Sequence, residues 1–125
     1  MIYAVGTDIV EVGRIERLLK KWSGRFIGRV YTKQEVEYCT AMAFPAQHFA
    51  ARFAAKEAAF KGIGRGIGSG IGFSDVEVVT EPEGRPKLKF YGKAREIVDR
   101  VGITGSHISL SHTDRYAVAF VVLEI

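Results

Sequence analysis

The sequence predicts an α+β fold in which helices pack on an antiparallel sheet, formed by a single domain that spans residues 1–125. Two observations support this class. Segments with the two-residue alternation of a strand lie at both ends of the chain and in its second half, and apolar residues recur at helical spacing between them. A composition of 47% hydrophobic and 26% charged residues is typical of globular domains, and no repeat or linker divides the chain.

Composition also limits the class of protein. No apolar run approaches the length of a membrane span, and the amino terminus lacks the basic and cleavage regions of a signal peptide. We therefore expect a cytoplasmic protein with no membrane partner. The single cysteine, Cys39, lies in a helical pattern and is predicted to be a small core residue.

The first strand is expected at residues 2–10, where alternation places Asp8 on the same face as Ile2, Ala4 and Gly6. An acid stands there where a core residue is expected, although an acid at the end of a strand can also serve only as a cap or turn former. An amphipathic helix with a basic outer face follows. Its apolar residues are Val12, Ile15, Leu18, Leu19 and Trp22, and its outward basic residues are Arg14, Arg17, Lys21 and Arg25.

Two more helices are predicted before the middle of the chain. The segment from Thr32 to Glu35 fits a capping box, so a helix should begin near Lys33 and end before Phe44. Pro45 suits the first turn of a longer helix that reaches Lys61.

The second half of the chain predicts a hairpin, a short helix and a second hairpin. The expected elements are strands at 74–80 and 87–91, a helix between Gly92 and Gly102, and strands on both sides of a polar turn at 111–113. Residues 117–123 are apolar on both faces, so this last strand should be central in the sheet or lie at a subunit contact.

The long helix carries an unusual acid. Helical spacing puts Phe49, Phe53, Glu57 and Phe60 on one face, so Glu57 is a carboxylate among phenylalanines. Because an unpaired carboxylate is costly to bury, Glu57 should be paired, protonated or bound to a metal. The simplest alternative is an i,i+4 ion pair with Lys61.

Glycines alternate with other residues from Gly62 to Gly72, directly after this helix. Such a backbone can approach a ligand closely and can aim several N–H groups at an anion, although a flexible loop is the alternative. The stretch matches neither the P-loop nor the dinucleotide-binding motif. Because the carboxyl end of a helix is partly negative, a phosphate bound here would also need Lys61, Arg65 or a metal.

Asp8 and Glu57 together could hold a hard cation. A pair of protein carboxylates is typical of Mg²⁺, which completes its coordination with water and substrate phosphate. A pyrophosphate would be suited by the glycine N–H groups, by Lys61 and Arg65, and by the hydroxyl and imidazole groups of residues 111–113. Turn formation explains Ser111 and Thr113 but not His112, which could also be structural.

A basic segment runs from Arg14 to Lys33, with seven basic residues and one acid, Glu16. Such a patch attracts a polyanion, which could be nucleic acid, an anionic membrane surface or an acidic protein. One tryptophan and no regular aromatic ladder give little support for stacking on single-stranded nucleic acid. The residues alone therefore predict a metal-dependent, phosphate-handling protein with an acidic partner.

Three ordered motifs then carry a resemblance that covers essentially the whole chain. They are GTDIVEV at 6–12, RFAAKEAAFK at 52–61 followed by Gly62 and Gly64, and HISLSH at 107–112. With these motifs the sequence resembles the holo-(acyl-carrier-protein) synthases, the short bacterial type of 4′-phosphopantetheinyl transferase. The resemblance implies the fold of that family and transfer of the phosphopantetheine arm of coenzyme A to a serine of apo acyl carrier protein in fatty acid biosynthesis.

The same resemblance implies roles for individual residues. Asp8 and Glu57 would bind Mg²⁺, and the base that deprotonates the serine could be Glu57, a metal-bound water or His112. The expected coenzyme A ligands are Arg52, Lys61, Gly64, Arg65, Ser111, His112 and Thr113. The carrier protein would dock on Arg14, Arg17, Lys21 and Arg25. Family members are homotrimers with coenzyme A sites between subunits, so each site would need residues from two chains.

Two other functions compete with this interpretation. A basic module that binds RNA through residues 14–33 would show salt-sensitive binding, but it would leave Asp8 and Glu57 unexplained. A phosphatase or nucleotidyl transferase could use the same metal pair with water or another hydroxyl.

Overall fold

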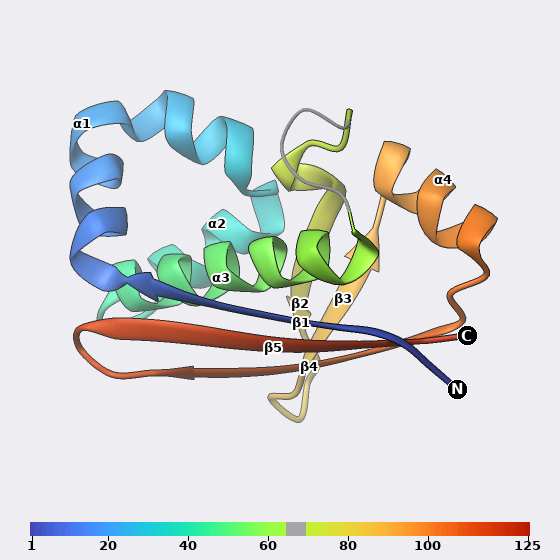
Figure 1. Cartoon of the computed structure of the whole chain (residues 1–125). Helices are drawn as coiled ribbons and strands as arrows, with labels where there is room; N and C mark the ends of the chain where they lie inside the picture. The colour runs from blue at the N-terminus through green and yellow to red at the C-terminus, as the bar shows by residue number, and fades with distance from the viewer. Residues whose placement is uncertain (65–69) are drawn as a thin grey trace.

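The computed structural model describes residues 1–64 and 70–125 and confirms the α+β class (Figure 1). The elements in chain order are β1 (Ile2–Glu11), α1 (Val12–Val30), α2 (Lys33–Thr40), α3 (Pro45–Ile63), a 3₁₀ turn η1 (Phe73–Asp75), β2 (Val76–Thr80), β3 (Pro86–Phe90), α4 (Gly92–Val101), β4 (Gly105–His112) and β5 (Tyr116–Glu124). The described strands form two antiparallel sheets, where the sequence predicted one. No helix in these residues is long and apolar enough to span a membrane.

The larger sheet has the order β1-β5-β4, so the last strand is central, as its apolar pattern predicted. The smaller sheet is the hairpin of β2 and β3. Alternation on β1 is confirmed from Ala4 onward, because Gly6 and Val10 are buried and Asp8 is half-buried on the same face. Ile2, expected on that face, is exposed, because the pairing register shifts between Ile2 and Ala4. That face packs on α3, which lies over the sheet and runs roughly along the strands (Figure 1).

Close packing of α3 on β1 depends on one glycine. A Cβ atom at Gly6 would lie 1.8 Å from the carbonyl oxygen of Ala58, which no real side chain could tolerate. Across the interface, Gly62 lies against the side chain of Leu123 on β5. Glycine at residue 6 therefore sets how near the long helix comes to the strand that carries Asp8.

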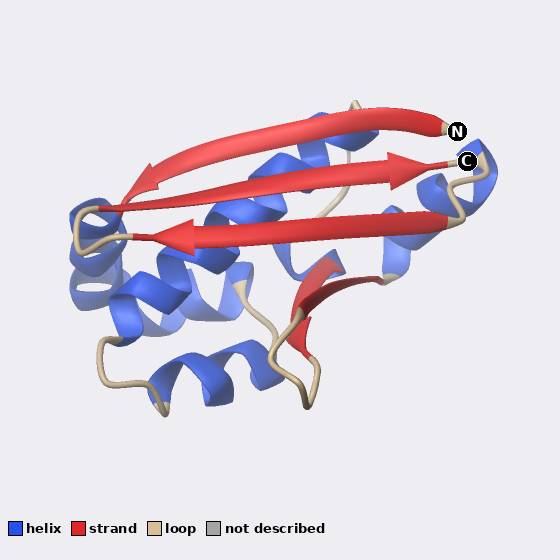
Figure 2. Ribbon diagram, turned by 90° about the horizontal axis from the view of Figure 1, so that it is seen from below, coloured by secondary structure: helices blue, strands red, loops and turns tan. Residues whose placement is uncertain are grey.

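The opposite face of the larger sheet is left uncovered by the described chain, as Figure 2 shows. Its exposed residues are largely apolar and include Val5, Ile9, Val118 and Phe120. All helices lie behind the sheet in that view. This face is therefore a large apolar surface open to solvent in the single chain.

Helix α1 differs from the expected straight amphipathic helix. Trp22 has non-helical backbone angles (φ −121°, ψ 21°), and the helix turns sharply there before it continues to Val30 (Figure 1). Trp22 was predicted to face inward, but it is 45% exposed. The inward positions of Val12 and Ile15 are confirmed, because both are buried. The first half of α1 thus packs on the core and the second half crosses above α3.

The hairpin also begins later than predicted. Residues 73–75 form η1, so the strand expected from Ser74 starts at Val76. Three consecutive residues, Val76, Glu77 and Val78, are buried, because this strand is covered on both sides. The second strand, the helix between Gly92 and Gly102, and the capping box of α2 agree with the sequence predictions.

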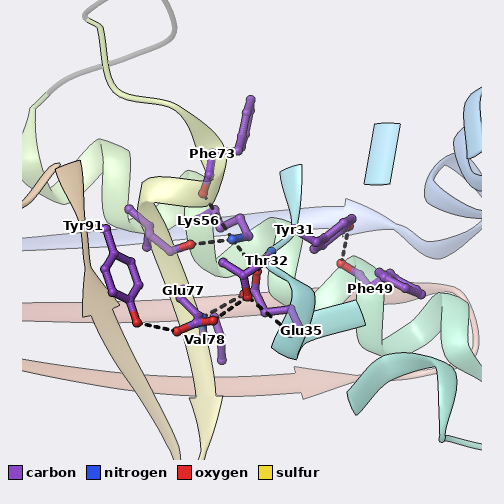
Figure 3. A network of polar contacts seen from close by, with 10 residues as sticks. Tyr31, Thr32, Glu35, Phe49, Lys56, Phe73, Glu77, Val78 and Tyr91 are labelled. Atoms are coloured by element: carbon purple, nitrogen blue, oxygen red, sulfur yellow. Dashed lines mark hydrogen bonds and ion pairs between the residues drawn. The ribbon is translucent and has the colours of Figure 1, made fainter. Parts of the chain in front are cut away.

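A buried ion pair, which the sequence analysis missed, links α3 to α2 and β2 (Figure 3). The Nζ of Lys56 donates to Oε1 of Glu35 at 2.8 Å and to the carbonyl oxygen of Phe73 at 3.2 Å, and it also donates to the carbonyl of Val76. The other oxygen of Glu35 accepts from the N–H of Val78 at 2.8 Å. Burial lowers the pKa of Lys56, and the charge of Glu35 opposes that change. Both side chains are fully buried, so each depends on the other for its charge.

A second buried acid, Glu77, completes this network from β2. Its carboxylate accepts from the hydroxyl of Tyr91 at 2.8 Å and from the hydroxyl of Thr32 (Figure 3). Cys39 lies nearby in the core, as predicted, and burial raises the pKa of its thiol to about 12. The thiol therefore stays protonated and behaves as a small apolar group.

We expect Lys56→Ala to lower the free energy of unfolding by about 3–5 kcal/mol, because Glu35 would be left buried without a counter-charge. The double variant Lys56→Met, Glu35→Gln should recover part of that loss, since no unpaired charge remains. Urea denaturation followed by circular dichroism measures both. Lys20→Ala, at an exposed pair with Glu16, is the control and should change stability little. A Lys56→Ala variant as stable as this control would contradict the role of the pair.

Candidate active site

Asp8 and Glu57 come together as the sequence predicted. Asp8 projects from the helix-facing side of β1, and Glu57 projects from α3, which Gly6 allows to lie close to that strand. Burial raises the pKa of Glu57, and the negative charge of Asp8 raises it further. Lys61 and Arg14 act in the opposite direction. Two acidic side chains from different elements therefore share one half-buried position beside two cations.

Lys61 pairs with Asp8 and not with Glu57. Its Nζ lies 3.0 Å from Oδ1 of Asp8 and 3.1 Å from the carbonyl oxygen of Thr7, so the i,i+4 pair with Glu57, the simplest alternative for that acid, does not form. The crossing of α3 over β1 places the end of the lysine side chain on the strand. In residues 1–64 and 70–125, no basic side chain forms an ion pair with Glu57 within 4.0 Å.

The carboxyl end of α3 has the predicted glycine. Gly64 adopts a left-handed conformation (φ 81°) and caps the helix, and its N–H donates to the carbonyl oxygens of Phe60 and Lys61 at 3.0 and 3.2 Å. This donor is therefore already used within the helix end. Arg65, the next predicted ligand, lies outside the described residues, as do Gly66 and Gly68.

The three candidate residues at the polar turn between β4 and β5 differ in orientation and in hydrogen bonding. Ser111 and His112 are neighbours on β4, so they point to opposite faces of the sheet, with His112 on the helix side. The hydroxyl of Thr113 accepts from the N–H groups of Arg115 and Tyr116 at 3.2 and 3.0 Å, which is the turn-forming role expected for this residue type. All three residues are exposed.

Arg52 is buried, although it was predicted to bind coenzyme A. Its guanidinium lies 4.1 Å from the centre of the Tyr38 ring and donates to the hydroxyl of Thr80 at 3.0 Å. One turn before it on α3, His48 contacts His112. Helix α3 extends about 20 Å between His48 and Lys61 at 1.5 Å per residue. Within one chain, the predicted phosphate ligands thus form two separate groups along the helix.

A hollow of about 430 Å³ lies between the bent helix α1 and α3, next to the acidic pair. It is lined by Arg14, Leu18, Trp22, Arg25, Phe26, Arg29, Val30, Phe53 and Phe73. The sequence placed Arg14 and Arg25 on a face opposite the apolar residues, but the bend at Trp22 brings both around the same hollow. Arg17 and Lys21 are exposed and do not line it. The result is an apolar depression with arginines among its walls.

The acidic pair meets the requirements of a magnesium site. Among the described residues, no group of three or more histidine, cysteine or acidic side chains could hold a metal. Mg²⁺ needs only one or two protein carboxylates, since it retains water and binds substrate phosphates. Burial and the negative charge of Asp8 raise the pKa of Glu57, and a bound cation would offset both effects. Asp8 and Glu57 therefore fit Mg²⁺ better than they fit a metal that needs a full set of protein ligands.

Comparison with known proteins connects this arrangement to one family. Residues 4–121 match the family model of the 4′-phosphopantetheinyl transferase superfamily. A holo-(acyl-carrier-protein) synthase of Syntrophus aciditrophicus is 50% identical over 124 residues, which cover 99% of this chain and 97% of that protein.

Solved structures agree with this relationship. The crystal structure of the holo-(acyl-carrier-protein) synthase from Neisseria meningitidis has a TM-score of 0.89 and 38% identity, with all of both chains covered. The synthase from Helicobacter pylori, solved in complex with coenzyme A, has a TM-score of 0.85 and 30% identity over 96% of this chain and 99% of that one.

The pKa of Glu57 tests the geometry of the acidic pair directly. In metal-free protein it should lie above the ordinary glutamate value, and in Asp8→Asn it should fall, because the repulsion of the second carboxylate is lost while burial remains. NMR titration of the Glu57 side-chain carboxyl measures both values. Glu11→Gln, an exposed acid on the same strand, is the matched control and should leave the pKa of Glu57 unchanged. An equal pKa in wild type and Asp8→Asn would show that the carboxylates do not interact.

Proposed function

The chain belongs to the 4′-phosphopantetheinyl transferase superfamily and is a holo-(acyl-carrier-protein) synthase, and from this we propose the reaction and the residues that perform it. The enzyme transfers the 4′-phosphopantetheine arm of coenzyme A to a serine of apo acyl carrier protein. The products are holo acyl carrier protein and adenosine 3′,5′-bisphosphate. The reaction requires Mg²⁺, serves fatty acid biosynthesis and takes place in the cytoplasm.

The observation that carries this proposal is the pair of carboxylates on β1 and α3. Asp8 and Glu57 repel one another in a half-buried position, and this arrangement favours a divalent cation between them. When bound there, Mg²⁺ supplies positive charge that stabilises the phosphate oxygens of coenzyme A during transfer. Neither a basic RNA-binding module nor a solvent-facing charged helix would require two acids at this position.

Lys61 is the cation best placed to contact the substrate. Its Nζ is held by Asp8 and Thr7, yet its side chain is 56% exposed, so it can also reach a phosphate oxygen. As a flexible point charge it can follow the phosphate during transfer. Gly64, Arg65, Ser111 and Thr113 complete the proposed set of coenzyme A ligands.

The proton of the carrier-protein serine needs an acceptor. Glu57 is a carboxylate at the proposed reacting centre on α3, so it is the first candidate. His112 is the second candidate, but in its own chain it lies with His48, far along α3 from Lys61. We therefore assign Glu57 to the reacting centre of its own chain and His112, with Arg52, to the binding of phosphate.

The separation of these groups supports a site shared between subunits. Residues at the carboxyl end of α3 and residues near His112 can meet around one coenzyme A molecule if two chains contribute. The uncovered apolar face of the sheet, which includes Val5 and Phe120, offers a surface for that contact. We propose that the enzyme is a homotrimer with its active sites between subunits.

The hollow beside α1 fits the acidic carrier protein. Arg14 and Arg25 would attract acidic side chains of the partner, and the apolar walls, such as Leu18 and Phe53, could receive one of its apolar side chains. Arg17 and Lys21 extend the positive surface outward along α1. Nucleic acid is not part of this proposal, since the surface lacks an aromatic ladder.

Mass spectrometry of apo carrier protein, incubated with coenzyme A and Mg²⁺ with and without this enzyme, tests the proposed transfer. Glu57→Gln should retain the fold and abolish transfer, because the amide is a weak Mg²⁺ ligand. Asp8→Asn should behave alike. Replacing outer partners of a metal site costs about 10- to 100-fold, so loss of a direct ligand should exceed about 100-fold.

Excess Mg²⁺ should rescue either variant only in part, and Glu11→Gln is the control that should remain active. Near-normal turnover of both Glu57→Gln and Asp8→Asn at ordinary Mg²⁺ concentrations would overturn the metal assignment.

Charge reversal on the hollow tests carrier-protein docking. Arg25→Glu is cleaner than Arg14→Glu, because Arg14 also influences Glu57. We expect the KM for carrier protein to rise by roughly 5- to 150-fold, mainly through slower association, and the loss to shrink as salt increases. Coenzyme A affinity should remain unchanged.

The matched control for this experiment is Lys20→Glu, because Lys20 lies on the same helix but does not line the hollow. If both variants show the same KM for carrier protein as the wild type, the docking surface lies elsewhere.

A further inference from the structure

A second imidazole, that of His48, packs against His112. The two ring centres are 5.3 Å apart and the rings meet edge to face at 66°. His48 lies on α3 and His112 lies at the end of β4, so the contact joins the helix to the edge strand of the larger sheet. On its other side His48 contacts the ring of Tyr38 from α2, with centres 6.0 Å apart. No motif in the sequence singled out His48.

Arg52 continues this cluster one helical turn later. Its guanidinium covers the Tyr38 ring and donates to Thr80, but its Nε is buried and has no hydrogen-bond partner in the part of the chain that the structure describes. A buried donor without an acceptor costs free energy, so such a group indicates either strain or a missing partner. An anion close to this cluster would supply an acceptor.

The charges that contribute to the pKa of His48 are of one sign. Burial lowers the pKa of His48, and the positive charges of His112 on β4 and Arg52 on its own helix lower it further. The group that faces it from α2 is the neutral phenol of Tyr38. Among the residues that the structure describes, no acidic side chain contributes to this shift. Clustered basic groups are typical of a site that receives an anion.

We propose that His48 is a further specificity-determining residue of the transferase, which binds a phosphate group of coenzyme A together with His112 and Arg52. This assignment rests on the proposed function, since that function makes coenzyme A the substrate. A bound phosphate offsets the positive charge around His48, so His48 takes up a proton when coenzyme A binds. His48 does not take part in forming or breaking a bond.

A purely structural His48 would make a different prediction. If the ring served only to support His112 by packing, phenylalanine would replace it well, because the two rings have similar size and both can meet an imidazole edge to face. His48→Phe therefore separates packing from recognition. His48→Gln retains a hydrogen-bond donor but cannot gain a proton near neutral pH, so it separates hydrogen bonding from protonation.

Isothermal titration calorimetry of the full-length enzyme with coenzyme A, in two buffers of different ionisation enthalpy, measures affinity and proton uptake together. We expect His48→Phe to weaken coenzyme A binding roughly tenfold, in line with loss of a hydrogen bond to a charged group, and to reduce proton uptake. His48→Gln should bind more tightly than His48→Phe but show the same reduced uptake. In transfer assays, the KM for coenzyme A should rise in His48→Phe while kcat changes little.

Dephospho-coenzyme A, which lacks the 3′-phosphate, identifies the phosphate that is recognised. If wild type and His48→Phe bind it equally well, His48 contacts the 3′-phosphate, and if the difference persists, His48 contacts the pyrophosphate. Either result supports the assignment.

If His48→Phe binds coenzyme A with wild-type affinity and wild-type proton uptake, the assignment is overturned and His48 has only a packing role. If His48→Phe does not fold, unchanged proton uptake in His48→Gln would overturn the assignment in the same way. The proposed function fails separately, if wild type binds coenzyme A but leaves the mass of apo carrier protein unchanged.

Discussion

The rest of the structure depends on the close approach of α3 to β1. A helix can lie this near a strand only where both surfaces are small, and here Gly6 lies against the backbone of Ala58 while alanines line the buried side of the helix. Any side chain at residue 6 would push the helix away from the sheet. That movement would separate Asp8 from Glu57, so the packing constraint and the candidate metal site share one cause.

Two neighbouring residues of α3 point to different sides of the helix and have different roles. Lys56 points into the core, where Glu35 and two backbone carbonyls hold its charge, and this network anchors the helix to α2 and β2. Glu57 points the other way and keeps a charge that its surroundings disfavour. The buried network of Lys56 holds the helix in place, although Asp8 and Glu57 repel one another on its other side.

In the proposed enzyme, function requires more surface than one chain brings together. The acidic pair and Lys61 lie at one part of α3, whereas His112, His48 and Arg52 lie toward its beginning. An uncovered apolar sheet face and an arginine-lined hollow remain open in the single chain. In the proposed enzyme these surfaces serve subunit contact and carrier-protein docking.

Strand and helix periodicity predicted the fold class and most element boundaries, and it revealed Asp8 and Glu57 as acids at positions where core residues belong. The sequence also carried the family resemblance, which the comparisons confirm. Which side chains meet is set by how the elements pack. Three contacts join segments far apart in the chain: Lys61 with Asp8, Lys56 with Glu35, and His48 with His112. The bend at Trp22 depends on packing between elements. Local spacing assigns a residue to a face of its own helix or strand, but the partner on that face is set by how the elements cross.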